Sequence, residues 1–419
     1  GTLHLIVNEG VIEKIDVEGS VRAEESFVLR EFDMKEGDIF RIEKAKRGIK
    51  NINSTKVFEY VYLEVSYENQ KPKLTLRLAE LPSQLIRLGM RVDDERKFQG
   101  TIDIRDENFR GIGTELGLTL SVGGRNGYAN LEFKSNRLFS SLFTFSIAGF
   151  ASVYNSYVYR DDPEVVARNR WDRARVGEYS DIRWGGRLTA GAQLERLGNA
   201  TIEWSLQDSR IRSVANVEQL QEHYRLSLLK IGTVIDTRNI IPFATSGFNV
   251  KVSYEFASKN FLSDVGYNAV RAMYESYSSW GERLTFHPRI TFGFADVTMP
   301  LGQQFRLGGR ETMFGTREDD RRGRQMLAIN LAFRYKLPVR LLFDTYLRMR
   351  YDLATISEIP EQIKFSEFRH GIGAEVGFDT PIGQAAFGAG KSFFFPRDKV
   401  GTPLQLGPLL FYFVLGYEL

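Results

Sequence analysis

The segment "FNVKVSYEF", residues 248–256, alternates apolar and polar side chains over its whole length. Successive side chains of a β-strand point to opposite faces, so this alternation predicts a strand. One face would carry Phe248, Val250, Val252, Tyr254 and Phe256, and the other Asn249, Lys251, Ser253 and Glu255. Such a strand separates an apolar environment from a polar one.

The same pattern returns in "LAINLAFRYKL", 327–337, and "RLLFDTYLRMRY", 340–351. From about residue 85 to the C-terminus one strand-length segment follows another, about sixteen in all, and many of them reach the ten or so residues that cross a bilayer. A soluble β-sandwich also alternates, but its strands are about half as long. Residues 83–419 are therefore predicted to form an all-β transmembrane barrel of about 16 antiparallel strands.

The connections between these segments differ in length on the two sides. Those near residues 108, 195, 281, 336 and 379 are short, whereas 160–175, 298–325, 353–368 and 396–407 are long and charged. Short turns on one side and long loops on the other are typical of outer-membrane barrels. An even strand count leaves both barrel ends on the short-turn side, which we expect to be periplasmic.

Residues 1–82 have a different periodicity and predict a small α+β domain. "VIEKIDVEG" (11–19) indicates a strand with Val11, Ile15 and Val17 on one face. Two helices follow, the second with Ile42, Ala45, Ile49 and Ile52 at helical spacing. Two further strands would bury Val61, Leu63 and Val65, and then Leu74, Leu76 and Leu78. The predicted order is strand, helix, helix, strand, strand.

The amino-acid composition argues against several classes of function. The chain carries 56 basic and 53 acidic residues, for a net charge of +3, so no strong positive field for nucleic acid is expected. Cysteine is absent, which removes disulfides and thiol chemistry. The longest apolar run, "LLFYFVLG" at 409–416, is too short for a membrane-spanning helix.

No motif for catalysis or cofactor binding is recognisable. His4, His223, His287 and His370 lack the spacing of metal ligands. "GIGTELG" (111–117) and "GIGAEVG" (371–377) differ from a dinucleotide fingerprint, because three residues precede the last glycine. We expect no cofactor, no metal and no enzymatic activity in this chain.

Several segments of the sequence match the motifs of one superfamily. "GVIEKIDVEGSVRAEESFVLREF" (10–32) resembles a POTRA domain, "NFRGIGTEL" (108–116) an early hairpin, "DTRNIIPFATSGF" (236–248) the Asp-Thr-Arg turn, and "GIGAEVGFDTPIG" (371–383) the penultimate hairpin. Because of these segments, the chain resembles the outer-membrane protein assembly and surface antigen superfamily. That group includes BamA-type insertases, two-partner secretion translocators and the barrel end of patatin-like phospholipase fusions.

The resemblance implies that the long loop after strand eleven folds back into the barrel, where an arginine in a Val-Arg-Gly-Phe/Tyr tip meets acidic groups on the inner wall. Here the tip reads "MFGT", so Phe314 stands where that arginine is usual, and Arg310 or Arg317 would supply the charge instead. The implied loop residues are Gly308, Gly309, Arg310, Phe314, Gly315 and Arg317, with Asp344, Glu375 and Asp379 as wall partners. The alternative is a solvated external loop with self-compensating charges.

The resemblance also implies a weak lateral seam between strand one, residues 85–93, and strand sixteen, residues 409–419. Glycine weakens a strand, and the residues implied at the seam are Gly89, Gly407, Gly416 and Leu419. Family members usually end on an aromatic residue, whereas this chain ends on Leu419.

The implied function is insertion or translocation of proteins at the outer membrane of a Gram-negative-type bacterium, with residues 1–82 in the periplasm. Two alternatives stay open. One is the membrane anchor of a patatin-like phospholipase fusion, whose catalytic domain lies outside this chain; the other is a passive porin. The implied partners are outer-membrane lipids and a client polypeptide or a fused N-terminal domain. The patatin-type relatives leave a homodimer open, and no nucleic acid is expected.

Overall fold

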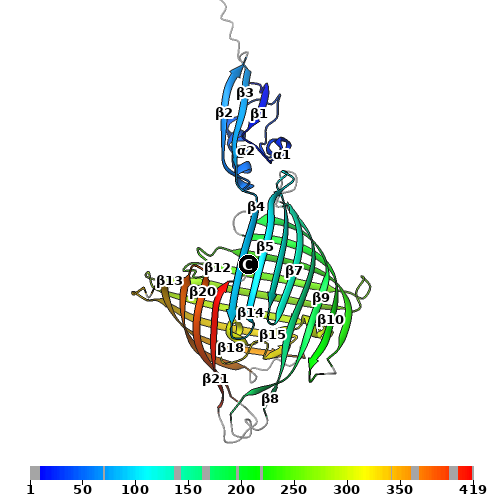
Figure 1. The fold of residues 1–419 in the computed structure, drawn as a ribbon, viewed down its shortest axis with the longest axis vertical. Helices are drawn as coiled ribbons and strands as arrows, with labels where there is room; N and C mark the ends of the chain where they lie inside the picture. The colour runs from blue at the N-terminus through cyan, green and yellow to red at the C-terminus, as the bar shows by residue number, and fades with distance from the viewer. Residues whose placement is uncertain are drawn as a thin grey trace, which may run out of the picture. The chain divides into compact units, whose positions relative to one another are not determined.

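Sixteen strands close into one barrel in the computed structural model of the chain (Figure 1). The structure describes residues 10–68, 71–135, 143–162, 170–194, 198–217, 220–340, 342–359, 368–395 and 404–417. All barrel pairs with a recorded register are antiparallel. The predicted sixteen-stranded antiparallel barrel is confirmed.

The barrel strands are β4 (Gln84–Asp93), β5 (Lys97–Phe109), β6 (Thr114–Gly123), β7 (Asn126–Ser135), β8 (Phe143–Asp161), β9 (Arg173–Leu194), β10 (Gly198–Ala215), β11 (Glu222–Asp236), β12 (Gly247–Ala257), β13 (Tyr267–Trp280), β14 (Leu284–Ala295), β17 (Gln325–Lys336), β18 (Asp344–Ser357), β19 (Arg369–Thr380), β20 (Gly383–Phe394) and β21 (Gln405–Tyr417).

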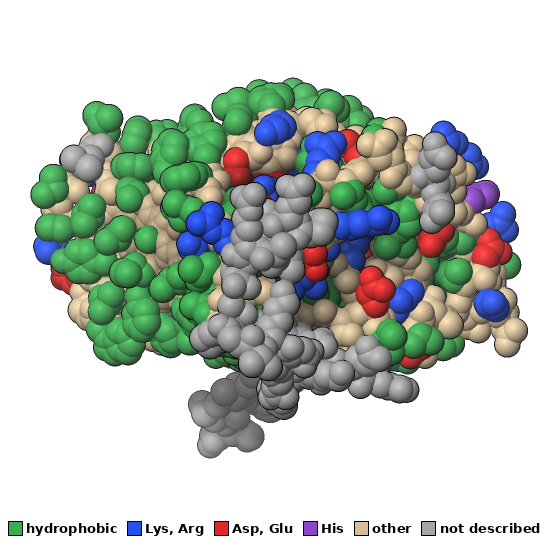
Figure 2. Space-filling view, turned by 90° about the horizontal axis from the view of Figure 1, so that it is seen from below, with side chains coloured by type: hydrophobic (Ala, Val, Ile, Leu, Met, Phe, Trp, Pro, Cys, Tyr) green, Lys and Arg blue, Asp and Glu red, His purple; other side chains and the backbone are tan. Residues whose placement is uncertain are grey.

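Strand β12 shows how the alternation builds the wall. Asn249 and Glu255 are buried in the barrel interior, whereas Phe248, Tyr254 and Phe256 are exposed on the outside. A membrane barrel buries this outer face in lipid, so exposed aromatic side chains carry no penalty there. Seen from below, hydrophobic side chains dominate the left part of the surface, and charged side chains gather at the middle and right (Figure 2).

Most loop lengths follow the predicted asymmetry; connection 237–246, on the short-turn side, is an exception. The connections 110–113, 195–197, 281–283 and 381–382 are short, and 162–172, 258–266, 296–324 and 358–368 are long. The expected loops 160–175, 353–368 and 396–407 need a correction, because β8, β9, β18 and β21 extend into them.

The connection between β14 and β17 has structure of its own. It contains the short helices η1 (Leu301–Gln303) and α4 (Gly309–Thr312), and strands β15 (Phe305–Leu307) and β16 (Arg321–Gly323) pair as a small hairpin. The helical pattern of the sequence ends near residue 85, because these later helices are too short to produce a detectable periodicity.

The N-terminal elements follow the predicted order: β1 (Lys14–Glu18), α1 (Glu25–Glu31), α2 (Ile42–Ser54), β2 (Phe58–Glu68) and β3 (Lys71–Glu80). The sheet order is β1-β3-β2, with β1 parallel and β2 antiparallel to β3. Leu74, Leu76 and Leu78 of β3 form the middle of its core, where α1 and α2 contribute Phe27, Val28, Ala45 and Ile52.

Three core predictions are wrong. Ile42 is 61% exposed, because it is the first residue of α2. Ile12 and not Val11 is buried, and Val65 is exposed near the end of β2.

Contacts divide the chain into two compact units. The first contains residues 1–87, 103–118 and 131–148, and the second residues 88–102, 119–130 and 149–419. The domain boundary at 82/83 remains a prediction. No helix in the described part of the chain is long and apolar enough to cross a membrane.

Candidate functional site

The long connection between β14 and β17 lies in the barrel lumen. Its Asp319 accepts hydrogen bonds from Tyr154 and Ser156 on β8, at 2.8 and 2.9 Å, and its Phe314 amide donates to Asp352 on β18 at 2.7 Å. Strands β8 and β18 are eight places apart in the closed ring of sixteen. A segment that contacts two opposite walls must cross the lumen; we call residues 304–325 the luminal loop.

Two glycines make the turn that starts the loop tip. Gly308 and Gly309 have φ angles of 133° and 79°, which side chains rarely adopt. A Cβ on Gly308 would also lie 2.1 Å from the carbonyl oxygen of Arg317. The chain can therefore double back at this point only with glycine there.

The tip packs Phe314 into a socket in the wall. The ring is fully buried and lies against Gly373 and Gly390, where added Cβ atoms would come within 3.0 and 2.8 Å of Phe314 atoms. On another side, the guanidinium carbon of Arg350 lies 4.0 Å from the ring centroid. Gly315 has a φ of 76° and approaches β20 so closely that a Cβ would lie 2.1 Å from the Ser392 nitrogen.

Asp352 is the acidic group that holds the tip. Besides the Phe314 amide, its Oδ2 accepts from the Arg350 guanidinium at 3.0 and 2.8 Å, and its Oδ1 accepts from the Asn330 amide at 2.7 Å. All of these groups are buried, where hydrogen bonds to a charged group are strong and their loss is costly. The guanidinium that stacks on the tip thus comes from the wall and not from the loop.

Of the expected wall partners, Glu375 contacts the loop. Arg310 donates two hydrogen bonds to it, both 3.0 Å long, and Arg348 lies 3.4 Å away. Arg317 instead pairs with Asp172 at 3.3 Å.

The expectations for Asp344 and Asp379 need correction. Asp344 pairs with Lys336 and Arg340 at the start of β18, and Asp379 lies opposite it in the β18–β19 ladder and is exposed. Alternation identified the inward-facing parity of Asp344, but not its depth in the barrel. It is eight residues from Asp352, or about 26 Å along a strand.

Within the described residues, the seam where the barrel closes is short. Strand β21 pairs with β4 through Val414–Tyr417 opposite Met90–Asp93, whereas its ladder with β20 runs from Gln405 to Gly416. Gly416 has a φ of 95°, and an added Cβ would lie 1.9 Å from the Met90 carbonyl oxygen.

The other expected seam residues lie elsewhere. Gly89 directly precedes the paired part of β4. Gly407 is placed against Ser392 and Trp171, so its expected position opposite strand one is wrong. Leu419 lies outside the described residues.

The luminal loop is bonded to both sides of this seam. On β21, the Tyr412 hydroxyl accepts from the amides of Gly315 and Thr316, at 2.7 and 3.1 Å, and donates to the Thr316 carbonyl. On the other side, the Glu318 amide donates to Glu95 at 3.0 Å in the β4–β5 turn.

Two further contacts complete this arrangement. The Glu318 carboxylate pairs with Arg96 at 2.7 Å. The Phe413 amide of β21 donates to the Asp94 carboxylate at 3.0 Å, which ties the turn to β21 directly. We call the bonds from the loop to Tyr412, Glu95 and Arg96 the seam clasp.

The electrostatics of the clasp centre on Glu95. Burial raises the pKa of its carboxyl to about 7. The hydrogen bond from the Glu318 amide opposes this rise, and the nearby carboxylates of Asp94 and Glu318 add to it. The guanidinium of Arg125 also opposes it. This carboxyl therefore changes charge near neutral pH.

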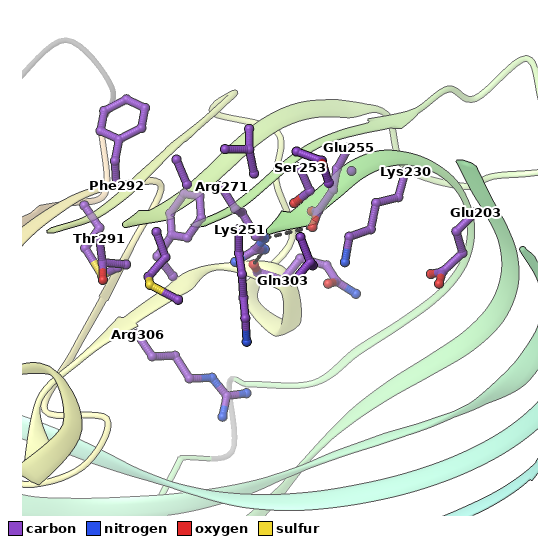
Figure 3. A pocket seen from close by; sticks show the side chains of 18 of the residues that line it. Glu203, Lys230, Lys251, Ser253, Glu255, Arg271, Thr291, Phe292, Gln303 and Arg306 are labelled. Atoms are coloured by element: carbon purple, nitrogen blue, oxygen red, sulfur yellow. Dashed lines mark hydrogen bonds and ion pairs between the residues drawn. The ribbon is translucent and has the colours of Figure 1, made fainter. Parts of the chain in front are cut away.

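Beside the loop, the lumen contains a cavity of about 730 Å³. Figure 3 shows Lys251 and Arg306 pointing into it, with Glu203 and Lys230 to one side. Glu255 accepts from Arg271 at 2.8 Å across the same wall. The lining mixes apolar side chains with these charged ones, and charged groups are typical of the water-filled interior of a membrane barrel.

Sequence reasoning missed Asp352, Arg350, Tyr412, Glu318 and Glu95. The inward parity of Arg348 and Arg350 continues to Asp352, so the period-two pattern contained that signal. Tyr412 stands in an apolar run of alternating aromatic residues, where nothing in the sequence marks its hydroxyl as a partner of the loop.

Comparisons with known proteins agree with this architecture. A family profile described as the Omp85 superfamily domain matches residues 108–418. The outer membrane protein assembly factor BamA of Nitratidesulfovibrio vulgaris is 21% identical over 413 residues, which cover 93% of this chain and 49% of the relative. BamA of Neorickettsia risticii is 25% identical over 146 residues, or 35% of this chain and 19% of the relative. The chain thus spans about half the length of the first relative.

Solved structures share the fold at low identity. The crystal structure of BamA from Haemophilus ducreyi lacking POTRA domains 1–3 has a TM-score of 0.75 and 15% identity, covering 97% of this chain and 84% of that one. CdiB from Acinetobacter baumannii has a TM-score of 0.60 and 13% identity, covering 97% and 74%.

Proposed function

Because the chain belongs to the Omp85 superfamily, we propose that it assists the insertion of client polypeptides into the outer membrane by opening laterally between β4 and β21. The observation that carries this proposal is the short seam, Met90–Asp93 opposite Val414–Tyr417. A ladder hydrogen bond contributes about 0.5–1.5 kcal/mol net, so a few pairs separate more readily than the ladder that joins β20 to β21.

Opening of the seam would present two unpaired strand edges to a client. An exposed edge offers a row of amide and carbonyl groups that can pair with another chain. A client strand added at β4 or β21 would replace the seam bonds with its own, so the barrel would lower the cost of bringing unpaired backbone into the membrane.

The luminal loop has a defined role in this proposal. Tyr412 and Glu95 lie on opposite sides of the seam, and both bond to the loop. Separation of the strands would break one set of these bonds. We propose that the loop holds the seam closed at rest and that its release accompanies opening.

The small α+β domain would receive the client. We propose that residues 1–82 form a POTRA-like domain in the periplasm and that β2 is its docking edge. In the sheet order β1-β3-β2 this strand pairs on one side only, and Tyr60, Tyr62 and Tyr67 are exposed along it. Strand addition at such an edge uses main-chain hydrogen bonds and thus accepts many sequences.

A translocator is the second candidate, and the luminal cavity is the observation that favours it. Translocation through the lumen would require the loop to leave it, whereas lateral insertion requires the seam to open. The membrane-anchor interpretation requires neither movement. We propose no enzymatic role for this chain.

The test is reconstitution of the chain into liposomes and measurement of how fast an unrelated unfolded outer-membrane barrel folds into them. An insertase accelerates folding over protein-free liposomes, with a heat-inactivated sample as control. Unchanged rates would refute insertion and favour the anchor interpretation.

A further inference from the structure

A charged cluster stands on the outer surface of the barrel, at the ends of β10 and β11 that lead into connection 216–221. The inner face of β10 is identified by its buried residues Ser205, Ser209 and Ile211. The alternate residues of β10 and their register partners on β11 therefore face outward. The cluster consists of Asp208, Arg210, Arg212, His223 and Arg225.

The ladder brings four of these side chains into a compact square. Arg210 lies opposite His223, and Asp208 opposite Arg225. Asp208 pairs with Arg210 at 3.2 Å and with His223 at 2.9 Å. The guanidinium of Arg210 also lies over the Trp184 ring, 4.7 Å from its centroid.

This geometry leaves positive charge uncompensated. The only acid of the square is already shared by Arg210 and His223. Within the described residues, no carboxylate lies within ion-pairing distance of the Arg212 or Arg225 guanidinium. The Asp264 carboxylate accepts from the main-chain amide of Arg225 and not from its guanidinium. Among the residues that the structure describes, these two forked cations thus have no carboxylate partner and can bind an anion.

The neighbouring side chains indicate the depth in the membrane at which the cluster lies. Ile202, Ile231, Tyr254 and Phe256 form an exposed apolar surface on the same side of β10–β12, and Trp184 of β9 lies opposite Asp208, at the level of the cluster. An arginine that faces the lipid is strongly destabilising at the bilayer midplane and nearly neutral close to the interface. Tryptophan concentrates at the headgroup level. The cluster therefore belongs at the headgroup level.

We infer that this cluster is a binding site for the anionic phosphate headgroup of an outer-leaflet lipid. Arginine binds phosphate through two parallel N–H donors, which Arg212 and Arg225 can both supply. Arg210 is held by Asp208 and Trp184, so it adds charge without having to be ordered on binding. The acyl chains of the same lipid would lie against Ile202 and Ile231. The inference uses the outer-membrane placement of the barrel and does not require client insertion.

The test compares lipid retention by the full chain and by the double variant Arg212→Gln/Arg225→Gln. Each protein is reconstituted into nanodiscs of phosphatidylcholine and phosphatidylglycerol, released into mild detergent, and its bound lipids are counted by native mass spectrometry. We expect the native chain to retain phosphatidylglycerol in preference to phosphatidylcholine. In the double variant this preference should fall about thirtyfold, since each basic residue near an anionic surface contributes about 1 kcal/mol, and about 1.4 kcal/mol corresponds to tenfold.

The control is Arg283→Gln, an exposed arginine in connection 281–283 at the opposite end of the strands, which should keep the native preference. A heat-modifiable gel shift verifies that each variant is a folded barrel. Equal retention by the native chain and the double variant would overturn the inference. Displacement of the lipid by millimolar inorganic phosphate would overturn it as well, because it would show a phosphate site indifferent to acyl chains.

Discussion

The guanidinium of Arg350 stacks on Phe314, with 4.0 Å between its carbon and the ring centroid, and both are held by the same carboxylate. Asp352 accepts from the Phe314 amide and from the Arg350 side chain. The loop therefore contributes the ring and the wall contributes the cation. From the superfamily resemblance we expected Arg310 or Arg317 of the loop to supply the charge at the tip, but the cation on Phe314 is Arg350 of the wall, whereas Arg310 pairs with Glu375 and Arg317 with Asp172.

An exchange of the two residues should be tolerated better than either change alone. Phe314→Arg alone buries a second cation beside Arg350, and Arg350→Phe alone leaves Asp352 without its guanidinium; each should cost about 2–4 kcal/mol of barrel stability. The double variant restores one cation, one ring and one carboxylate. We expect it to recover at least half of the loss in the midpoint of heat-modifiable unfolding. Strictly additive losses would show that the two residues do not act as a pair.

Removal of the Tyr412 hydroxyl should loosen the luminal loop. In Tyr412→Phe, the buried amides of Gly315 and Thr316 lose their acceptor, at a cost of about 1–3 kcal/mol. Limited proteolysis of the reconstituted protein should cut within residues 304–325 faster than in the native chain. Tyr335→Phe is the matched control, because Tyr335 is exposed on the outer face of β17. Equal cutting of both variants would contradict the role of the hydroxyl.

The seam clasp should weaken as pH rises through neutrality. The folded pKa of Glu95 is raised to about 7, above its ordinary value of 4.5. The stabilisation is therefore complete below pH 4.5 and is lost as pH rises through 7. At about 1.4 kcal/mol per pKa unit the loss is up to about 3 kcal/mol.

This pH dependence is measured as the fall in thermal midpoint between pH 5 and pH 8. Glu95→Gln keeps an acceptor for the Glu318 amide but cannot ionise, so its fall should be smaller than that of the native chain. Identical falls would assign the pH dependence to other groups.

A side chain at Gly416 should disturb the seam specifically. In Gly416→Val, the valine would have to adopt a φ of 95°, and its Cβ would lie 1.9 Å from the Met90 carbonyl oxygen. The backbone strain alone costs about 1–3 kcal/mol, and the clash with Met90 adds to it. The disulfide yield of the pair Val92→Cys/Leu415→Cys, which lie opposite each other, should fall. Gly149→Val on β8, where an added Cβ meets nothing within 4 Å, should leave the yield unchanged. A fall with both variants would indicate general damage to the barrel.

The barrel could be predicted from the sequence, but the contacts within its lumen could not. Alternation in segments such as 248–256 depends only on near neighbours, so strand number and facing could be predicted. The contact between Phe314 and Asp352 joins residues 38 positions apart through the path of the loop, which no local pattern encodes. Asp344 was misplaced for a related reason: parity determines the face of a strand residue, and only the register of the folded barrel determines its depth.

The most direct measurement of the central claim is client folding with the seam locked. The chain has no cysteine, so Met90→Cys/Tyr417→Cys creates a single disulfide across opposing residues of β4 and β21. Tyr274→Cys/Ile290→Cys locks an ordinary ladder between β13 and β14 and serves as control. We predict that the oxidised seam variant in liposomes fails to accelerate folding of an outer-membrane barrel, that reductant restores the acceleration, and that the control accelerates in both states. Full acceleration with the seam oxidised would contradict lateral opening between β4 and β21.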